Sequence, residues 1–337
     1  MSDLQRYLVV GSGSIARRHI ANLKQLFPDS IVSCISASGR PLLAAEVGAD
    51  IIYQSLAQAM ENPYQFAIVA TPAPFHVRQA AALLHGGVPV MIEKPLADSM
   101  ATFEAAGDML LANKHKIDVA YNLRFMPSAI RIKALLDERV LGKIYSVLID
   151  VGQFLPDWRP TTDYRKNVSA QKKLGGGVLL ELSHELDYLA WLFGNFESVF
   201  CITANSGALD IDVEDTVDAI LRRKDGLIAT LHMDFLQRAP SRTCKIIGES
   251  GTLIWNLLSN SISLHTSQDS EKVLFSDPHY NRNVMYMDEL SRFSKVATGE
   301  LSPAVGIDQA LYTLRLVEAL KKSSVMRQAV TIGDFDS

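Results

Sequence analysis

The stretch Tyr7-Leu8-Val9-Val10-Gly11-Ser12-Gly13-Ser14-Ile15-Ala16 decides the fold of the first part of this chain. An apolar run of β type leads straight into a glycine-rich turn, and a helical segment follows from Arg17 to Phe27. In such a turn the first glycine allows a tight bend, the second lets the backbone approach a pyrophosphate, and the small third residue lets helix and strand pack closely. The pattern predicts a dinucleotide-binding turn with phosphate charge at the start of a helix.

Further short apolar runs alternate with helical segments over the first 121 residues. The runs cover residues 31–35, 51–53, 66–70, 88–92 and 117–120. This alternation is typical of a doubly wound parallel sheet of the Rossmann type, in which ligands bind beyond the carboxyl ends of the strands. Thr71-Pro72 and Glu93-Lys94-Pro95 fall at two such ends. We therefore expect the glycine turn, Thr71 and Lys94 to line one crevice.

Lys94 is the first candidate for a catalytic group. It follows the apolar run Val88-Pro89-Val90-Met91-Ile92 after one glutamate, and Pro95 stands directly behind it. Proline fixes its own backbone torsion, so covalent geometry restricts the direction of the preceding lysine. A partly desolvated lysine also exchanges protons readily. The plain alternative is an ordinary exit from a strand into a loop.

The end of the second apolar run bears on the choice of cofactor. A site that prefers NAD places an acid there to bind the ribose hydroxyls. This chain has Ser36, Ser38 and Arg40 at that place and no acid before Glu46. Serine hydroxyls and an arginine fork suit a phosphate, so we expect NADP to be preferred, with NAD as the alternative.

The second part of the chain changes character after Ala120. Alternating segments at 143–155, 197–206, 214–224 and 227–235 indicate a mostly antiparallel sheet, and Asp225-Gly226 predicts a hairpin between the last two. We expect a Rossmann domain over residues 1–121 and an α+β domain with a large open-faced sheet over 122–337. Because an uncovered sheet face would expose apolar side chains, we expect a homodimer or homotetramer formed through this sheet.

A polar cluster follows three glycines, Gly175-Gly176-Gly177, which could let the backbone approach a ligand. Glu181, His184 and Asp187 recur every three residues after them, so a single helix would place all three on one side. A lone helical histidine is more often structural, but three ionisable groups together indicate a site. We expect no metal, because no second histidine or cysteine stands at a suitable spacing.

Composition excludes several classes of function. The chain has 337 residues, 48% of them hydrophobic and 21% charged, with a net charge of -4. Its length favours two domains, and its charge gives no basic field for nucleic acid. No apolar run approaches the ~20 residues of a membrane span, so we expect a cytoplasmic protein with no membrane partner. The three cysteines are isolated and suggest buried hydrophobes.

Together these motifs resemble the Gfo/Idh/MocA oxidoreductases over essentially the whole chain. The resemblance rests on the glycine turn with His19, Ala70-Thr71-Pro72 with His76, Glu93-Lys94-Pro95, Asn122-Leu123-Arg124-Phe125, the three glycines with His184 and Asp187, and the segment Gly306 to Ser323. It implies NAD(P)-dependent hydride transfer at a hydroxyl or ketone carbon of a sugar, cyclitol or sugar nucleotide. One departure is that the family has Asp four residues before the histidine, where this chain has Leu180, with Glu181 next to it.

The resemblance, read with the residues, gives three groups of expected site residues. The catalytic residues are Lys94 and His184, and either could transfer the proton. The cofactor-binding residues are Gly11, Gly13, Ser14, Ile15, Ser36, Ser38, Arg40, Thr71, Pro72, His76, Glu93 and Lys94. The substrate-binding residues are Asn122, Arg124, Trp158, Tyr164, Arg165, Glu181 and Asp187. Two alternatives stay open: a noncatalytic sensor of NAD(P) or sugar, and an enzyme that uses its cofactor transiently in a redox-neutral sugar conversion.

Overall fold

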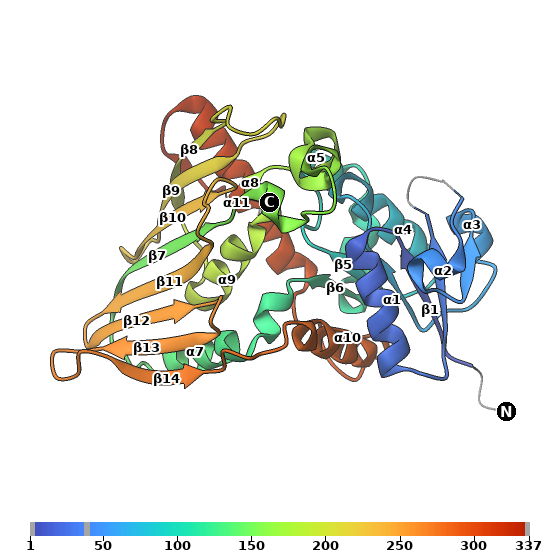
Figure 1. Cartoon of the computed structure of the whole chain (residues 1–337), viewed down its shortest axis with the longest axis horizontal. Helices are drawn as coiled ribbons and strands as arrows, with labels where there is room; N and C mark the ends of the chain where they lie inside the picture. Colours follow the sequence, from blue (N-terminus) through green and yellow to red (C-terminus); the bar gives the residue numbers. More distant parts are fainter. Residues whose placement is uncertain (1–3, 37–40, 334–337) are drawn as a thin grey trace. The chain divides into compact units, whose positions relative to one another are not determined.

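The computed structural model describes residues 4–36 and 41–333, which divide into two units (Figure 1). The first unit holds residues up to Asn122 together with Asn283–Leu314, and the second holds Leu123–Arg282 and the residues after Leu314. Residues 283–314 were expected in the second domain. They return to the first unit because Asp118 accepts hydrogen bonds from the backbone N–H groups of Ala304 and Val305, at 2.8 and 2.7 Å.

The first unit is built on a six-stranded parallel sheet, which confirms the predicted Rossmann fold. The strands are β1 (Arg6–Val10), β2 (Ile31–Ile35), β3 (Ile51–Tyr53), β4 (Phe66–Val69), β5 (Val90–Glu93) and β6 (Ile117–Ala120), in the order β3-β2-β1-β4-β5-β6. Successive side chains of a strand alternate between two hydrophobic clusters. Leu8 and Val10 belong to one, and Tyr7 and Val9 belong to the other. The sheet is therefore buried on both faces, as a doubly wound fold requires.

Helices of the first unit connect these strands and cover the sheet. They are α1 (Ser14–Leu26), α2 (Ala44–Val47), α3 (Leu56–Ala59), α4 (His76–His85), α5 (Met100–Glu104), α6 (Asp108–Ala112), α10 (Asn283–Ala297) and the first part of α11 (Ile307–Met326). Short 3-10 turns lie at Ala73–Phe75, Lys114–Lys116 and Asn122–Phe125. Helix α10 lies beside α1, where Asn22 and Asn283 exchange side-chain hydrogen bonds (Figure 1).

The second unit carries a nine-stranded sheet in the order β14-β13-β12-β11-β7-β10-β9-β8-β15. Its strands are β7 (Ile144–Gly152), β8 (Ser198–Ala204), β9 (Thr216–Arg222), β10 (Ile228–Asp234), β11 (Ser241–Gly248), β12 (Gly251–Asn256), β13 (Ser261–His265), β14 (Lys272–Ser276) and β15 (Val330–Thr331). Every pair is antiparallel except β7 with β10. The mostly antiparallel sheet and the hairpin at Asp225-Gly226 are confirmed.

One face of this sheet packs against helices α7 (Pro127–Asp137), α8 (Val178–Glu181) and α9 (Ser183–Phe193) (Figure 1). The opposite face carries exposed apolar side chains, because strand residues alternate between the two faces. Phe200, Ile220, Thr230 and Leu148 are register partners across four neighbouring strands, and the three apolar ones are exposed. The open-faced character of the sheet follows from this row.

Candidate active site

The order of strands in the first unit reverses between β1 and β4, and ligands of such sheets bind at that point. Gly11 follows β1 there with a φ of 130°, which favours glycine. A Cβ on Gly11 would collide with the carbonyl oxygen of Ala70, just after β4. The glycine turn and Thr71 are therefore neighbours, as the sequence predicted.

The start of α1 suits an anionic group. Gly13 precedes the helix without a side-chain cap, and the first turn contains no acid. A Cβ built on Gly13 meets no heavy atom within 4 Å, and both Gly13 and Ser14 are exposed. The first backbone N–H groups of a helix lack partners within it, and its dipole favours negative charge. The residues Gly13, Ser14 and Ile15 thus fit the pyrophosphate of a dinucleotide.

Of the three residues expected to select the cofactor, Ser36 lies in the described part of the chain. Ser36 is buried directly after the strand, and the N–H of Gly11 donates to the carbonyl of Ile35 at 2.9 Å. This bond holds the β2 end close to the glycine turn. Ser38 and Arg40 lie outside the described residues.

His76 ties together the segments that follow β4 and β5. Its Nε2 lies 2.6 Å from the carbonyl oxygen of Thr71 and its Nδ1 lies 2.8 Å from that of Pro95. Burial lowers the pKa of the imidazole, although both carbonyls act in the opposite direction. The ring is 1% exposed, so its visible contacts are with backbone carbonyls. His76 therefore shapes the two turns in which Thr71, Pro72 and Lys94 stand.

The Glu93-Lys94-Pro95 turn is held from its other side by His19. The Nε2 of His19 lies 2.6 Å from Oε1 of Glu93, and both residues are buried. Lys94 is half-buried and precedes a cis peptide bond to Pro95. Lys94 thus stands between two residues whose positions are fixed by histidines, one from α1 and one from α4.

Tyr286 of α10 lies beside expected site residues, a position that the sequence did not reveal. The guanidinium of Arg18 lies 4.5 Å from the centre of its ring, and the His19 ring meets it edge-on at 6.4 Å. Burial raises the pKa of Tyr286, and the charge of Glu93 adds to this, while Arg18 and a hydrogen bond with Asn122 oppose it. Asn122 is therefore engaged with this tyrosine. No local signal marks Tyr286, because only the return of α10 brings it to Glu93.

In the second unit two of the three glycines, Gly176 and Gly177, have no room for a side chain because other parts of the protein pack against them. A Cβ on Gly176 would collide with the carbonyl oxygen of Val168, and a Cβ on Gly177 would collide with the carboxylate of Glu214. That carboxylate accepts a hydrogen bond from the N–H of Leu179 at 3.0 Å, in the first turn of α8. Internal packing therefore accounts for glycine at these two positions, and the expected approach to a ligand stays a prediction.

The expected single helix carrying Glu181, His184 and Asp187 is wrong. Helix α8 ends at Glu181 and α9 begins at Ser183, with Leu182 between them at φ −99° and ψ 25°. Leu182 departs from helical torsions, so the regular spacing of 100° per residue is lost. The helix break at Leu182 could not be predicted from the sequence, because no proline or glycine stands at this position. Glu181 and His184, both half-buried, thus stand on opposite sides of a joint between two helices.

Asp187 forms a buried ion pair with Arg124. The Nε and a terminal nitrogen of the guanidinium donate to the two carboxylate oxygens at 2.9 and 2.7 Å. The side chains are 7% and 1% exposed, and the guanidinium also lies over the Trp191 ring at 5.4 Å. Arg124 and Asp187, which were both expected to bind substrate, are therefore paired with each other.

The remaining expected substrate residues lie on the loop after β7 and also contact protein groups. Trp158 donates from its indole nitrogen to the Gln153 carbonyl at 3.1 Å and packs edge-on against Phe235. The Tyr164 hydroxyl accepts from the N–H of Asp210 at 3.3 Å. Arg165 is exposed and pairs with Asp163 at 2.8 Å and with Asp210 at 3.4 Å. The charge of Arg165 is therefore balanced by carboxylates.

No group of three or more histidine, cysteine, aspartate or glutamate side chains in residues 4–36 and 41–333 is arranged to hold a metal ion. Within the same residues, no helix has the length and apolar character needed to cross a membrane.

The fold and the glycine turn define a dinucleotide-binding protein with a second, sheet-based unit. Family models bear out this class: residues 5–121 match the oxidoreductase family with an NAD-binding Rossmann fold, and residues 129–254 match the GFO/IDH/MocA C-terminal domain. The chain belongs to the Gfo/Idh/MocA oxidoreductase family.

Individual relatives match most or nearly all of the chain. The 1,5-anhydro-D-fructose reductase of Ensifer adhaerens is 24% identical over 98% of this chain and 99% of its own. The myo-inositol dehydrogenase Hyg17 of Streptomyces leeuwenhoekii is 26% identical over 73% of this chain and 74% of its own. Among solved structures, levoglucosan dehydrogenase in complex with NADH superposes with a TM-score of 0.84, at 19% identity, over 99% of this chain and 100% of that one.

Proposed function

We propose that this oxidoreductase transfers hydride between a nicotinamide cofactor and a hydroxyl or ketone carbon of a sugar or cyclitol. The observation that carries the proposal is the anchoring of Lys94, whose neighbours Glu93 and Pro95 are each held by a buried histidine. A lysine fixed in this way at the carboxyl end of β5 suits proton transfer or charge stabilisation at a reacting oxygen. The names of the sugar and cyclitol relatives support the substrate class.

The bound nicotinamide supplies or accepts the hydride, and the protein supplies acid-base chemistry. We assign the proton-handling and charge-stabilising roles to Lys94 and His184. An imidazole has an unperturbed pKa of about 6.5 and can exchange a proton near neutral pH. The ammonium of Lys94 can stabilise negative charge on the substrate oxygen. Both roles concern the oxygen of the reacting carbon. One group stabilises negative charge on that oxygen, and one group supplies or removes its proton.

A neutral polyol is favoured over a sugar nucleotide. Recognition of a phosphate would need an arginine fork that is free to bind it. Arg165 already faces Asp163 and Asp210, and Arg124 is paired with buried Asp187. A sugar nucleotide remains the second candidate, since the indole of Trp158 offers a stacking surface on the same loop.

The test is a panel of sugars, cyclitols and sugar nucleotides assayed with the full chain, with nicotinamide absorbance and product measured together. A dehydrogenase or reductase changes the absorbance in proportion to the product. Product without a net change would instead indicate that the cofactor is used transiently. Cofactor binding with no product across the panel would favour a sensor.

We also propose that NADP is preferred over NAD, and a titration of the two reduced cofactors tests this preference. Ser36 stands where an acid would otherwise bind the ribose hydroxyls. NADPH is expected to bind more tightly than NADH when the two are titrated side by side. Equal or tighter binding of NADH would contradict the preference.

We propose that the protein forms a homodimer or homotetramer through the exposed face of the large sheet. Phe200, Ile202, Ile220 and Ile228 are 39%, 59%, 49% and 44% exposed on neighbouring strands, which is unusual for a surface that stays in water. Sedimentation velocity at micromolar concentration is expected to show an oligomer, and Ile220→Lys is expected to shift it toward monomer. A wild-type protein that sediments as a monomer would rule the proposal out.

A further inference from the structure

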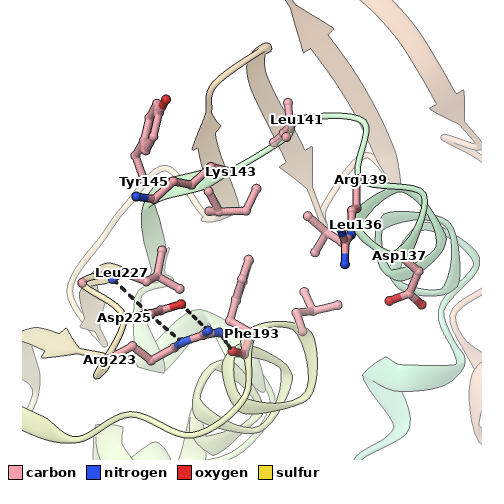
Figure 2. A pocket seen from close by; sticks show the side chains of 14 residues that line it. Leu136, Asp137, Arg139, Leu141, Lys143, Tyr145, Phe193, Arg223, Asp225 and Leu227 are labelled. Carbon is pink, nitrogen blue, oxygen red and sulfur yellow. Dashed lines mark hydrogen bonds and ion pairs between the residues drawn. The ribbon is translucent and has the colours of Figure 1, made fainter.

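A hollow of about 820 Å³ lies in the second unit, and its lining includes none of the residues expected to bind cofactor or substrate. Its walls come from the end of α7, the start of β7, the end of α9 and the β9–β10 hairpin (Figure 2). The volume lies in the range of about 300–1,000 Å³ that is usual for small-molecule sites. The hollow is large enough for one organic molecule.

Part of the lining is apolar. Leu141, Phe193 and Leu227 are at most 6% exposed, and Leu136 and Leu192 are half-buried around them. Tyr145 adds an aromatic ring that is 49% exposed at the edge. An apolar ring or chain placed here would remove hydrophobic surface from water, and this favours binding.

Two cations at the edge lack a compensating partner. Arg139 follows the C-terminal end of α7 and Lys143 precedes β7, and they lie on different sides of the hollow in Figure 2. Neither side chain has a hydrogen-bond or ion-pair partner within residues 4–36 and 41–333. By contrast, Arg223 is bound to Asp225 and to the Phe193 carbonyl, while Asp137 accepts from Lys133. The uncompensated charge of the hollow is therefore positive.

The backbone that carries these cations is fixed. Arg139 has a φ of 55°, and the N–H groups of Arg139 and Val140 donate to the carbonyls of Leu136 and Leu135, as in a Schellman helix end. Gly142 has a φ of 63°, and a Cβ there would come within 2.7 Å of a Glu249 carboxylate oxygen. A fixed loop loses little freedom on binding a ligand, so less binding free energy is lost to ordering.

We propose that this hollow binds a small organic anion that carries an apolar ring or chain, such as an aromatic carboxylate or sulfonate. The anionic group pairs with one of the two cations, Arg139 or Lys143, and the apolar part packs on Phe193 and the leucines. The site is distinct from the proposed reaction, yet the two share helix α9. His184 stands in the first turn of α9 and Phe193 ends it, about 13 Å away at 1.5 Å per residue. A ligand here would contact the far end of the helix that carries the proposed acid-base group.

The test uses anilinonaphthalene sulfonate, an aromatic sulfonate that fluoresces when bound, titrated into the full chain with saturating NAD⁺. The cofactor keeps the probe out of the dinucleotide turn. Wild-type protein is expected to show saturable binding that weakens with salt. The double variant Arg139→Gly, Lys143→Gln is expected to bind about tenfold more weakly, because the charge-assisted contact is lost whichever cation provides it.

The matched control is Arg327→Gly combined with Lys224→Gln. Arg327 follows α11 with a φ of 54°, so both glycine variants remove the same side chain from the same backbone conformation. Lys224 lies in the β9–β10 hairpin without lining the hollow. The substitutions Arg139→Gly and Arg327→Gly are each expected to keep or raise thermal stability, since glycine adopts a positive φ without strain. Equal weakening in both double variants, no weakening in either, or no saturable binding to wild type would overturn the proposal.

Discussion

Lys94→Ala is expected to lower kcat/KM by about 10²–10⁴-fold on the substrate that the panel identifies, the range typical for loss of a positioned acid-base group. The reason is geometric. Lys94 stands between Glu93, which is bound to His19, and Pro95, whose carbonyl is bound to His76. Alanine removes the ammonium but leaves these two contacts in place, so the turn itself should persist. Steady-state kinetics, together with cofactor titration, measures the effect.

Lys114→Ala is the matched control for this experiment. Lys114 is an exposed lysine of the same unit, paired with Asp308 at 2.6 Å, and its loss should leave turnover unchanged. Wild-type turnover in Lys94→Ala would remove Lys94 from the mechanism. An activity loss that comes with lost cofactor binding would instead assign it to the dinucleotide site.

Lys94→Arg separates the two roles still open for this side chain. Arginine keeps the positive charge but does not give up its proton near neutral pH. If Lys94 acts by charge alone, the arginine variant should retain much more activity than the alanine variant. If Lys94 transfers the proton, both variants should be impaired alike, and His184 then supports rather than performs that step.

Arg124→Ala is expected to lower the free energy of unfolding by about 3–5 kcal/mol, because it leaves the carboxylate of Asp187 buried without its partner. Asp187 is 1% exposed and receives two hydrogen bonds from this guanidinium. The loss should appear as a lower urea midpoint of the full chain. This loss of stability should appear in the absence of substrate, because a structural ion pair stabilises the free protein and a substrate contact does not.

Two further variants make this test specific. Arg165→Ala breaks pairs with Asp163 and Asp210 at a side chain that is 53% exposed, and should cost at most about 1 kcal/mol. Arg124→Met combined with Asp187→Leu removes both buried charges together and should recover most of the lost stability. An Arg124→Ala variant with wild-type stability and reduced substrate affinity would return Arg124 to the substrate site.

Local pattern was sufficient wherever neighbouring residues decide the structure. The glycine turn, the parallel strands of the first unit and the Asp225-Gly226 hairpin all follow from torsional preference and period-two alternation. The same reasoning was wrong for the segment from Gly175 to Asp187. Its spacing suited one helix, but the helix is interrupted at Leu182, and Gly176 and Gly177 pack against the Val168 carbonyl and Glu214.

The sequence by itself determined the fold class, the family and the placing of Lys94 at a strand end, because these depend on contacts close in the chain. Only the tertiary structure decided which polar groups pair with one another inside the protein and which stay available to bind a ligand. It brought α10 back to place Tyr286 beside Glu93, joined Arg124 to Asp187, and gathered three distant segments around the cationic hollow. Such pairings arise when apolar faces are buried against one another, and no local periodicity encodes which polar groups meet as a result.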